Sequence, residues 1–186
     1  MKKRATQLVI AALFTLGSGV GIYNFTGTDV TLPNGEVIKT GKLTESLTKH
    51  YQERNIEDSL YITIHHTAGS KNQSLESIAK FHVEMNGWPA IAYHIAINDD
   101  GDINFLNDIE ERTYHDSGEN TVSIGVVLVG NYEEDLPSED MIKSVKLVTD
   151  ALCQSLKIKG IRAHRDTSPT LCCGINAYVK LKDVFF

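Results

Sequence analysis

The chain of 186 residues has few cysteines and prolines, and it lacks any dense cluster of basic residues. Its three cysteines all lie at or after position 153, which excludes the disulfide framework of a small secreted domain. A formal net charge of −6, without a Lys/Arg-rich patch, argues against nucleic acid as a partner. With 41% apolar and 23% charged residues, the composition suits one globular domain with a short extension.

The first 28 residues depart from this average composition. Lys2–Arg4 is basic, no charged residue follows from Ala5 to Thr28, and Leu8–Leu16 is strongly apolar. This pattern predicts a signal peptide or signal anchor over residues 1–28. Its uncharged run is just long enough to span a bilayer, and the basic flank would stay cytoplasmic. We therefore expect export to the periplasm or cell envelope, with this segment inserted in the inner membrane at least transiently. Without a clear A-x-A site, cleavage and retention both stay open.

The rest of the chain predicts a linker and one compact domain. Residues 29–58 are interpreted as the linker, with a turn at 32–35 and a short polar helix over 44–57. From residue 59 to 186, apolar and β-branched runs predict strands, and amphipathic stretches predict helices. The strands are expected at 60–64, 91–98, 103–105, 123–129 and 161–163, and the helices at 74–85, capped by Ser74, and 136–156, capped by Ser138. The predicted fold is α/β, with a mixed central β-sheet flanked by helices and preceded by the hydrophobic N-terminal helix.

Two histidine motifs and a cysteine predict a metal site. One predicted strand ends at His65–His66, another delivers His164, and Cys172 follows eight residues later. Because successive strand residues point to opposite faces, only one of His65 and His66 enters a given site. Two imidazoles and one thiolate, with a fourth position left for water, are typical of catalytic zinc. The alternative for Cys172 is a small buried residue, but its polar neighbours are poor core formers.

Four motifs in order carry a family resemblance. They are Ile64–Gly69 (IHHTAG), Gly87–His94 (GWPAIAYH), Ser123–Val126 (SIGV) and Ala163–Cys172 (AHRDTSPTLC). Together they resemble the zinc N-acetylmuramoyl-L-alanine amidases, a family that includes phage endolysins and peptidoglycan recognition proteins. The similarity runs from about residue 61 to 174, which is most of the predicted domain.

The resemblance implies one zinc ion per chain, with His65, His164 and Cys172 as its ligands. The family usually has proline after the ligand cysteine, where this chain has Cys173. Cys173 could therefore replace Cys172 on the metal, or the two could form a vicinal disulfide. The eight-residue spacing favours Cys172, because a Zn–S bond of about 2.3 Å tolerates little misplacement.

The resemblance also implies roles for four further residues. Tyr93 and Thr170 match catalytic positions, and His115 resembles a histidine that family members place beside the substrate. Asn120, in the same stretch, is expected to contact the substrate as well. Zinc would activate a water and polarise the amide carbonyl. Tyr93 and Thr170 would orient the water or stabilise the oxyanion. The implied reaction is hydrolysis of the amide between N-acetylmuramic acid and L-alanine in peptidoglycan.

The biological setting is left with several alternatives. The weakly hydrophobic N-terminal segment resembles the signal-arrest-release anchors of some phage endolysins, which favours a membrane-exported endolysin that lyses the cell wall. The protein is expected to be a monomer. A periplasmic amidase of wall turnover and a non-catalytic peptidoglycan-binding module are the alternatives. A zinc-free acyl-transfer enzyme with a cysteine nucleophile is a further alternative, but it would leave His65 without a role.

The remaining histidines and the third cysteine are interpreted as structural. His82 lies on an apolar helix and is expected to be a core histidine with satisfied hydrogen bonds. His94 alternates with Tyr93 and should point away from the site. His66 is expected to pack or to support the site, and Cys153 is expected in the core of its helix.

Overall fold

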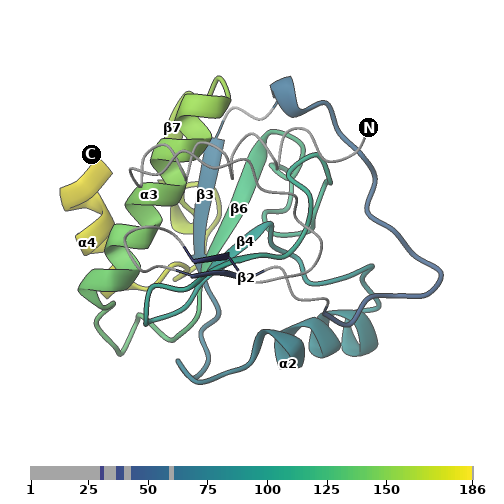
Figure 1. Ribbon diagram of the computed structural model, residues 1–186, viewed down its shortest axis with the longest axis horizontal. Coiled ribbons are helices and arrows are strands. Elements are labelled where there is room, and N and C mark those ends of the chain that lie inside the picture. The colour runs from purple at the N-terminus through teal and green to yellow at the C-terminus, as the bar shows by residue number, and fades with distance from the viewer. Residues whose placement is uncertain (1–29, 32–36, 40–42, 59–60, 186) are drawn as a thin grey trace.

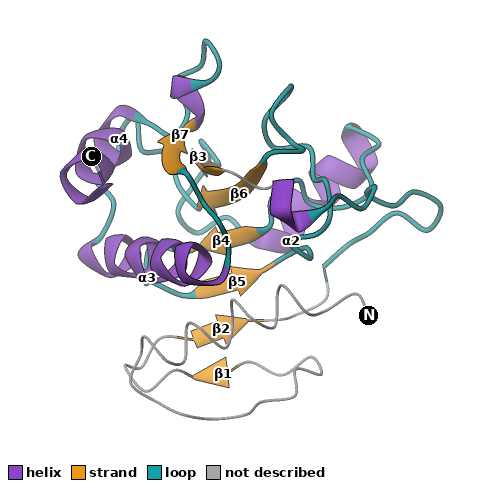
Figure 2. Cartoon of the chain, turned by 90° about the horizontal axis from the view of Figure 1, so that it is seen from above, coloured by secondary structure: helices purple, strands orange, loops and turns teal. Residues whose placement is uncertain are grey.

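The computed structural model describes residues 30–31, 37–39, 43–58 and 61–185. They form a mixed β-sheet with helices on both of its faces, as Figures 1 and 2 show, so the predicted α/β class is confirmed. The signal or anchor segment predicted over residues 1–28 and the turn predicted at 32–35 lie outside the described residues. Within the described part of the chain, every helix is too short or too polar to cross a membrane.

Among the described residues, the sheet has seven strands, in the order β1-β2-β5-β4-β6-β3-β7. Their bounds are Val30–Thr31 (β1), Val37–Lys39 (β2), Tyr61–His66 (β3), Ile95–Ile97 (β4), Ile103–Phe105 (β5), Ser123–Leu128 (β6) and Gly160–Ala163 (β7). β3 runs parallel to both of its neighbours, β6 and β7, and β4 pairs antiparallel with β5. The five predicted strands are all present, although β4 is shorter than expected. The expected linker contributes β1 and β2 to the edge of the sheet.

Two of the helices begin where the sequence provides a capping serine. α2 (Leu75–Lys80) continues into a turn of π-helix, η2 (Phe81–Met85), and the Ser74 side chain accepts from Ser77 N–H. α3 (Glu139–Ser155) begins after Ser138, whose side chain accepts from Met141 N–H. Both predicted N-caps are confirmed. α4 (Ile175–Phe185) was not predicted, and one turn of 3₁₀-helix, η3 (His164–Asp166), follows β7.

The two faces of the sheet have different neighbours. Ile62 and Ile64 of β3 are fully buried in the main core, which they share with α3 residues such as Val145 and Leu152. Figure 2 shows α3 and α4 on one side of the sheet and α2 on the other. Because side chains alternate along a strand, His65 points away from this core, toward the α2 side.

The segment from residue 43 to 58 corrects one prediction. No helix forms over 44–57, where the only helical turn is η1, at Ile56–Asp58. The backbone instead bonds to distant parts of the chain: Ser46 N–H donates to Pro89 O at 2.7 Å, and Arg54 N–H to Glu110 O at 2.8 Å. Tyr51, which lies between these two residues in the sequence, is buried. Tertiary hydrogen bonds thus override a weak local preference for helix.

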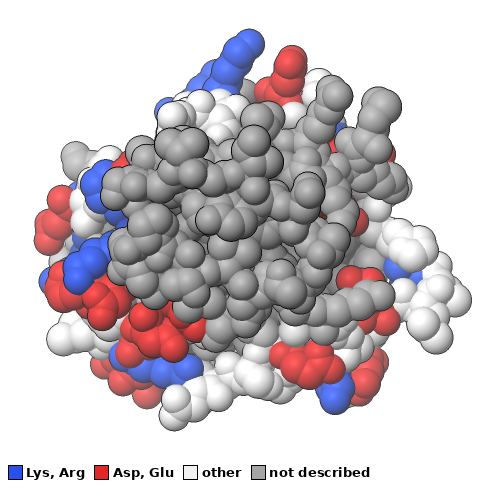
Figure 3. All heavy atoms as spheres, viewed as in Figure 1, with Lys and Arg blue, Asp and Glu red and all other residues white. Residues whose placement is uncertain are grey.

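Cys153 corrects a second prediction, because it is exposed and not in the core. The buried stripe of α3 includes Val145, Val148 and Leu152, at helical spacing. Cys153 lies one residue beyond Leu152, about 100° further around the helix axis. Exposed pairs such as Lys146–Asp150, at 2.6 Å, occupy the outer face of α3. On the face seen in Figure 3, acidic and basic side chains of the described residues are intermixed.

Candidate metal centre

Two parallel strands bring His65 and His164 side by side. β3 pairs with β7 so that Ile64 lies opposite Ala163, and each of these two residues is followed by a histidine, His65 within β3 and His164 at the start of η3. The two imidazole rings lie 4.6 Å apart between centroids, at 54° to each other. The strand register therefore joins two motifs that are about a hundred residues apart in the sequence.

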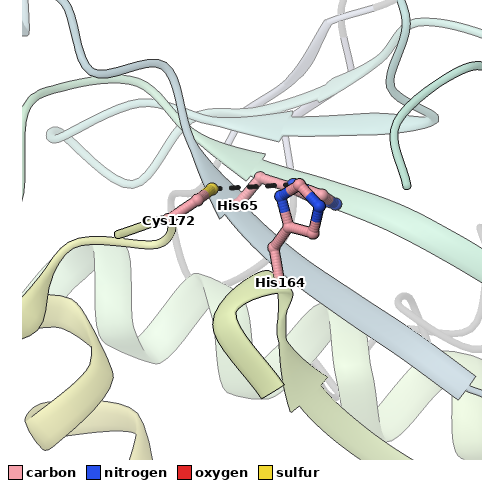
Figure 4. A group of neighbouring side chains, drawn as sticks. All are labelled: His65, His164 and Cys172. Atoms are coloured by element: carbon pink, nitrogen blue, oxygen red, sulfur yellow. Dashed lines mark hydrogen bonds between the residues drawn. The ribbon is translucent and has the colours of Figure 1, made fainter. Parts of the chain in front are cut away.

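The loop after His164 returns Cys172 to the same place. Arg165 N–H donates to Cys172 O at 2.8 Å, which closes the loop, and His66 N–H donates to Cys172 Sγ at 3.3 Å. Cys172 Sγ lies 3.7 Å from Nδ1 of His65. One ligand atom from each of His65, His164 and Cys172 lies within 4.8 Å of the others, and Figure 4 shows the three side chains converging.

Cys173 lies outside this group. Its side chain is fully buried in the main core, and both cysteines are free thiols. The structure therefore contains no vicinal disulfide between Cys172 and Cys173, and it brings Cys172, not its neighbour, to the two histidines.

His65 is 1% exposed. Burial, with smaller effects from the neighbouring His115 and His164, holds the pKa of His65 well below its ordinary range. Its Nδ1 faces Cys172, and its Nε2 lies 3.1 Å from Nδ1 of His115. An uncharged imidazole with a free lone pair is the form that binds a metal.

His164 is more exposed and lies against a buried acid. Its Nε2 is 3.5 Å from Oδ1 of Asp116, a side chain with no solvent exposure. Asp116 Oδ2 accepts from Thr167 Oγ1 at 3.1 Å and lies 3.7 Å from Arg162 Nη2. Oδ1 is the one buried side-chain nitrogen or oxygen atom of the described residues without a hydrogen-bond partner. Burial lowers the pKa of His164, and Asp116 opposes that shift.

These residues fit a zinc ion. Two imidazoles and a thiol are the N/N/S donor set that zinc accepts in catalytic sites. Burial raises the pKa of the Cys172 thiol to about 11, and a divalent cation would hold the group as a thiolate instead. Asp116 Oδ1, which has no hydrogen-bond partner, faces the His164 ring. Carboxylates commonly accept a hydrogen bond from the second ring nitrogen of a zinc-bound histidine.

The two residues predicted as catalytic lie beside this group. The Tyr93 ring, just before β4, lies 5.4 Å from the His65 ring between centroids. Burial is the main cause that raises the pKa of Tyr93, so its hydroxyl stays a donor. Thr170 Oγ1 accepts from Cys172 N–H at 3.2 Å. Both hydroxyl side chains thus adjoin a predicted ligand.

The two residues predicted to contact substrate have contacts within the protein. His115 is 6% exposed and lies behind His65. Asn120 Oδ1 accepts from Asp116 N–H at 2.7 Å and so shapes the turn that carries both His115 and Asp116. Sequence reasoning missed Asp116. Its one sequence signal was an acidic residue next to His115.

The histidines interpreted as structural are held by backbone groups. Nδ1 of His82 accepts from Ala92 N–H at 3.1 Å, and His82 is buried as predicted. Nδ1 of His94 accepts from Gly125 N–H at 2.9 Å, and Nδ1 of His66 accepts from Tyr132 N–H at 3.1 Å. None of the three belongs to the group around His65.

Comparison with known proteins identifies a family that this chain resembles. A family model described as N-acetylmuramoyl-L-alanine amidase matches residues 55–174. Peptidoglycan-recognition protein SC1a of Drosophila melanogaster is 31% identical over 132 residues, covering 66% of this chain and 71% of the relative. The endolysin of Escherichia phage T7 is 26% identical over 129 residues, covering 66% of this chain and 83% of the endolysin. N-acetylmuramoyl-L-alanine amidase LysC from Clostridium intestinale URNW has a TM-score of 0.70 at 24% identity, covering 80% of this chain and 98% of LysC.

The family match and the structural likeness agree with each other. At 24% identity the structural likeness shows a shared fold, whereas the family model spans well over half of the chain. The matched range contains all four sequence motifs and the three side chains that converge in Figure 4. The chain belongs to the N-acetylmuramoyl-L-alanine amidase family.

Proposed function

We propose that this protein hydrolyses the amide bond between N-acetylmuramic acid and L-alanine in peptidoglycan, with one zinc ion held by His65, His164 and Cys172. The observation that carries the proposal is the convergence of these three ligand atoms within 4.8 Å. Membership of the amidase family supports it, because the family model is named for this reaction.

The chain's own side chains would complete the chemistry. When bound, zinc supplies an activated water and polarises the scissile carbonyl. The Tyr93 hydroxyl, kept protonated by burial, can donate a hydrogen bond to the oxyanion that develops on that carbonyl. Thr170, whose hydroxyl accepts from Cys172 N–H, would hold the ligand loop in shape beside the metal ligand.

We further propose that the enzyme acts outside the inner membrane as an endolysin. The basic and then uncharged N-terminal sequence supports export, and the similarity to the phage T7 endolysin supports a lytic role. A periplasmic amidase of wall turnover uses the same chemistry and differs in its timing and control.

A binding module that does not hydrolyse its ligand is the second candidate. It is favoured by the 31% identity to a protein named as a peptidoglycan-recognition protein. Three candidate metal-ligand side chains and a partly buried tyrosine beside them favour the enzyme, because function depends on the site and not on the fold.

The test compares the full chain with Cys172→Ser, and uses Cys153→Ser as the matched control because Cys153 is an exposed thiol on α3. Zinc content and the release of new L-alanine amino termini from peptidoglycan are measured together. We expect about one zinc per wild-type chain, and a loss of activity in Cys172→Ser because one of the three protein ligands of a catalytic zinc is removed. Zinc without hydrolysis in the wild type would favour the binding module. Full activity in Cys172→Ser would refute the ligand assignment.

A further inference from the structure

Two consecutive residues, His115 and Asp116, lie behind the two histidines of the candidate metal centre. His115 Nδ1 lies 3.1 Å from His65 Nε2, and Asp116 Oδ1 lies 3.5 Å from His164 Nε2. In both histidines, therefore, the supporting group faces Nε2. The substrate role predicted for His115 does not account for this arrangement.

Hydrogen-bond chemistry fixes the proton on His65. Ser123 O is a carbonyl and can only accept, so His115 Nε2, 3.3 Å away, must donate to it. An uncharged imidazole has one donor and one acceptor, which makes His115 Nδ1 the acceptor. His65 Nε2 must then carry the proton that it donates to His115. The lone pair of His65 is left on Nδ1, the atom 3.7 Å from Cys172 Sγ.

The same logic applies to His164. A carboxylate oxygen only accepts, and Asp116 Oδ1 is fully buried without a hydrogen-bond partner among the described residues. An N–H at His164 Nε2 would supply the hydrogen bond that Asp116 Oδ1 lacks, if the two atoms moved slightly closer than their present 3.5 Å. Nδ1 of His164 is then the atom left to bind a metal.

Residues of β6 and of the neighbouring loops fix the positions of His115 and Asp116. Gly125 of β6 leaves room for the His115 ring, because a Cβ at that position would lie 2.5 Å from His115 Cγ. Asn120 Oδ1 accepts from Asp116 N–H at 2.7 Å, and Thr167 Oγ1 donates to Asp116 Oδ2 at 3.1 Å. The His115 ring therefore fits against β6, and hydrogen bonds with Asn120 and Thr167 fix the position of Asp116.

We propose that His115 and Asp116 are positioning residues that fix His65 and His164 with protonated Nε2 atoms, so that both histidines present Nδ1 to the metal. This inference rests on the proposed zinc site and adds to it the orientation of two ligands. The supporting partners of zinc-bound histidines typically change metal affinity by about 10- to 100-fold when they are removed.

The experiment uses the full chain loaded with zinc and labelled with ¹⁵N. Long-range ¹H–¹⁵N spectra of the imidazole rings report which nitrogen carries a proton and which binds the metal. Zinc affinity is then measured by competition with a chromophoric chelator for wild type, His115→Phe and Asp116→Asn. Glu119→Gln is the matched control, because Glu119 pairs with the same Arg162, at 2.8 Å, without facing His164.

We expect protonated Nε2 and zinc-bound Nδ1 on both ligand histidines. Zinc affinity should fall about 10- to 100-fold in His115→Phe and in Asp116→Asn, and should stay unchanged in Glu119→Gln. Melting curves of the metal-free proteins check that each variant folds. The wild-type spectra need no substitution, so the inference can be tested even if a variant does not fold.

Zinc on Nε2 of either histidine, or unchanged zinc affinity in both variants, would overturn the inference. A His115→Phe enzyme with normal zinc affinity and only a raised KM would also overturn it, and would restore the predicted substrate contact. A wild type that binds zinc through Nδ1 but leaves peptidoglycan intact refutes the proposed reaction and leaves the positioning roles standing. A wild type that binds no zinc overturns both.

Discussion

Replacement of Arg54 by alanine should destabilise the whole domain, although Arg54 lies before the start predicted for it. The guanidinium is buried and donates to four backbone carbonyls of residues 109–123. Nε and Nη2 donate to Ile109 O at 3.2 and 2.9 Å, and Nη1 donates to Asn120 O at 3.0 Å, Thr121 O at 3.1 Å and Ser123 O. One side chain thus anchors the segment that carries His115 and Asp116.

The expected loss follows from these contacts. A hydrogen bond from a charged donor contributes about 1.5–3 kcal/mol, and the bonds to Ile109 and Ser123 are buried. The partly buried bonds contribute less, and contributions from one side chain do not add fully. We therefore expect Arg54→Ala to lower the free energy of unfolding by about 3–5 kcal/mol, a large share of the roughly 5–15 kcal/mol typical of a domain.

The assay is urea unfolding followed by circular dichroism and by fluorescence of Trp88, the single tryptophan. Arg112→Ala is the matched control, because Arg112 joins the same two segments through an exposed 2.7 Å hydrogen bond to Gln52. The control should lose about 1 kcal/mol or less. Equal losses in Arg54→Ala and Arg112→Ala would refute the reasoning. So would wild-type stability in a chain that starts at residue 59 and therefore lacks Arg54.

Two further predictions concern packing and pH. Gly125→Ala should displace the His115 ring and weaken zinc binding, as a chelator competition would show, whereas Gly160→Ala should be nearly neutral because its Cβ would meet only ordinary contacts. Burial lowers the pKa of His82 to about 4 in the folded chain, against about 6.5 when unfolded. The unfolded chain then binds more protons, so stability should fall as the pH drops from about 6.5 to 4. His82→Gln should lessen that fall in urea titrations, and an identical pH profile would contradict this account.

The convergence of the three candidate ligands could be predicted because it depends on strand ends. An apolar, β-branched run before His65 and a shorter one before His164 mark two strands, and strand ends are where sites form. The sequence could not show that β3 and β7 are direct neighbours with Ile64 opposite Ala163, yet that register places the rings 4.6 Å apart. The choice of Cys172 over Cys173 rests on the family resemblance and on the eight-residue spacing, and the burial of Cys173 in the core agrees with it.

The parts that could not be predicted depend on polar contacts across long sequence separations. Arg54 bonds to carbonyls 55 to 69 residues away, and no local periodicity encodes such contacts. The same limit applies to His115 and Asp116. Hydrophobic patterns reveal which residues are inside, but not which polar atom a buried polar group faces. In the structure, His115 faces Nε2 of His65 and Asp116 faces Nε2 of His164. The decisive measurement is therefore which ring nitrogen of each histidine carries the proton.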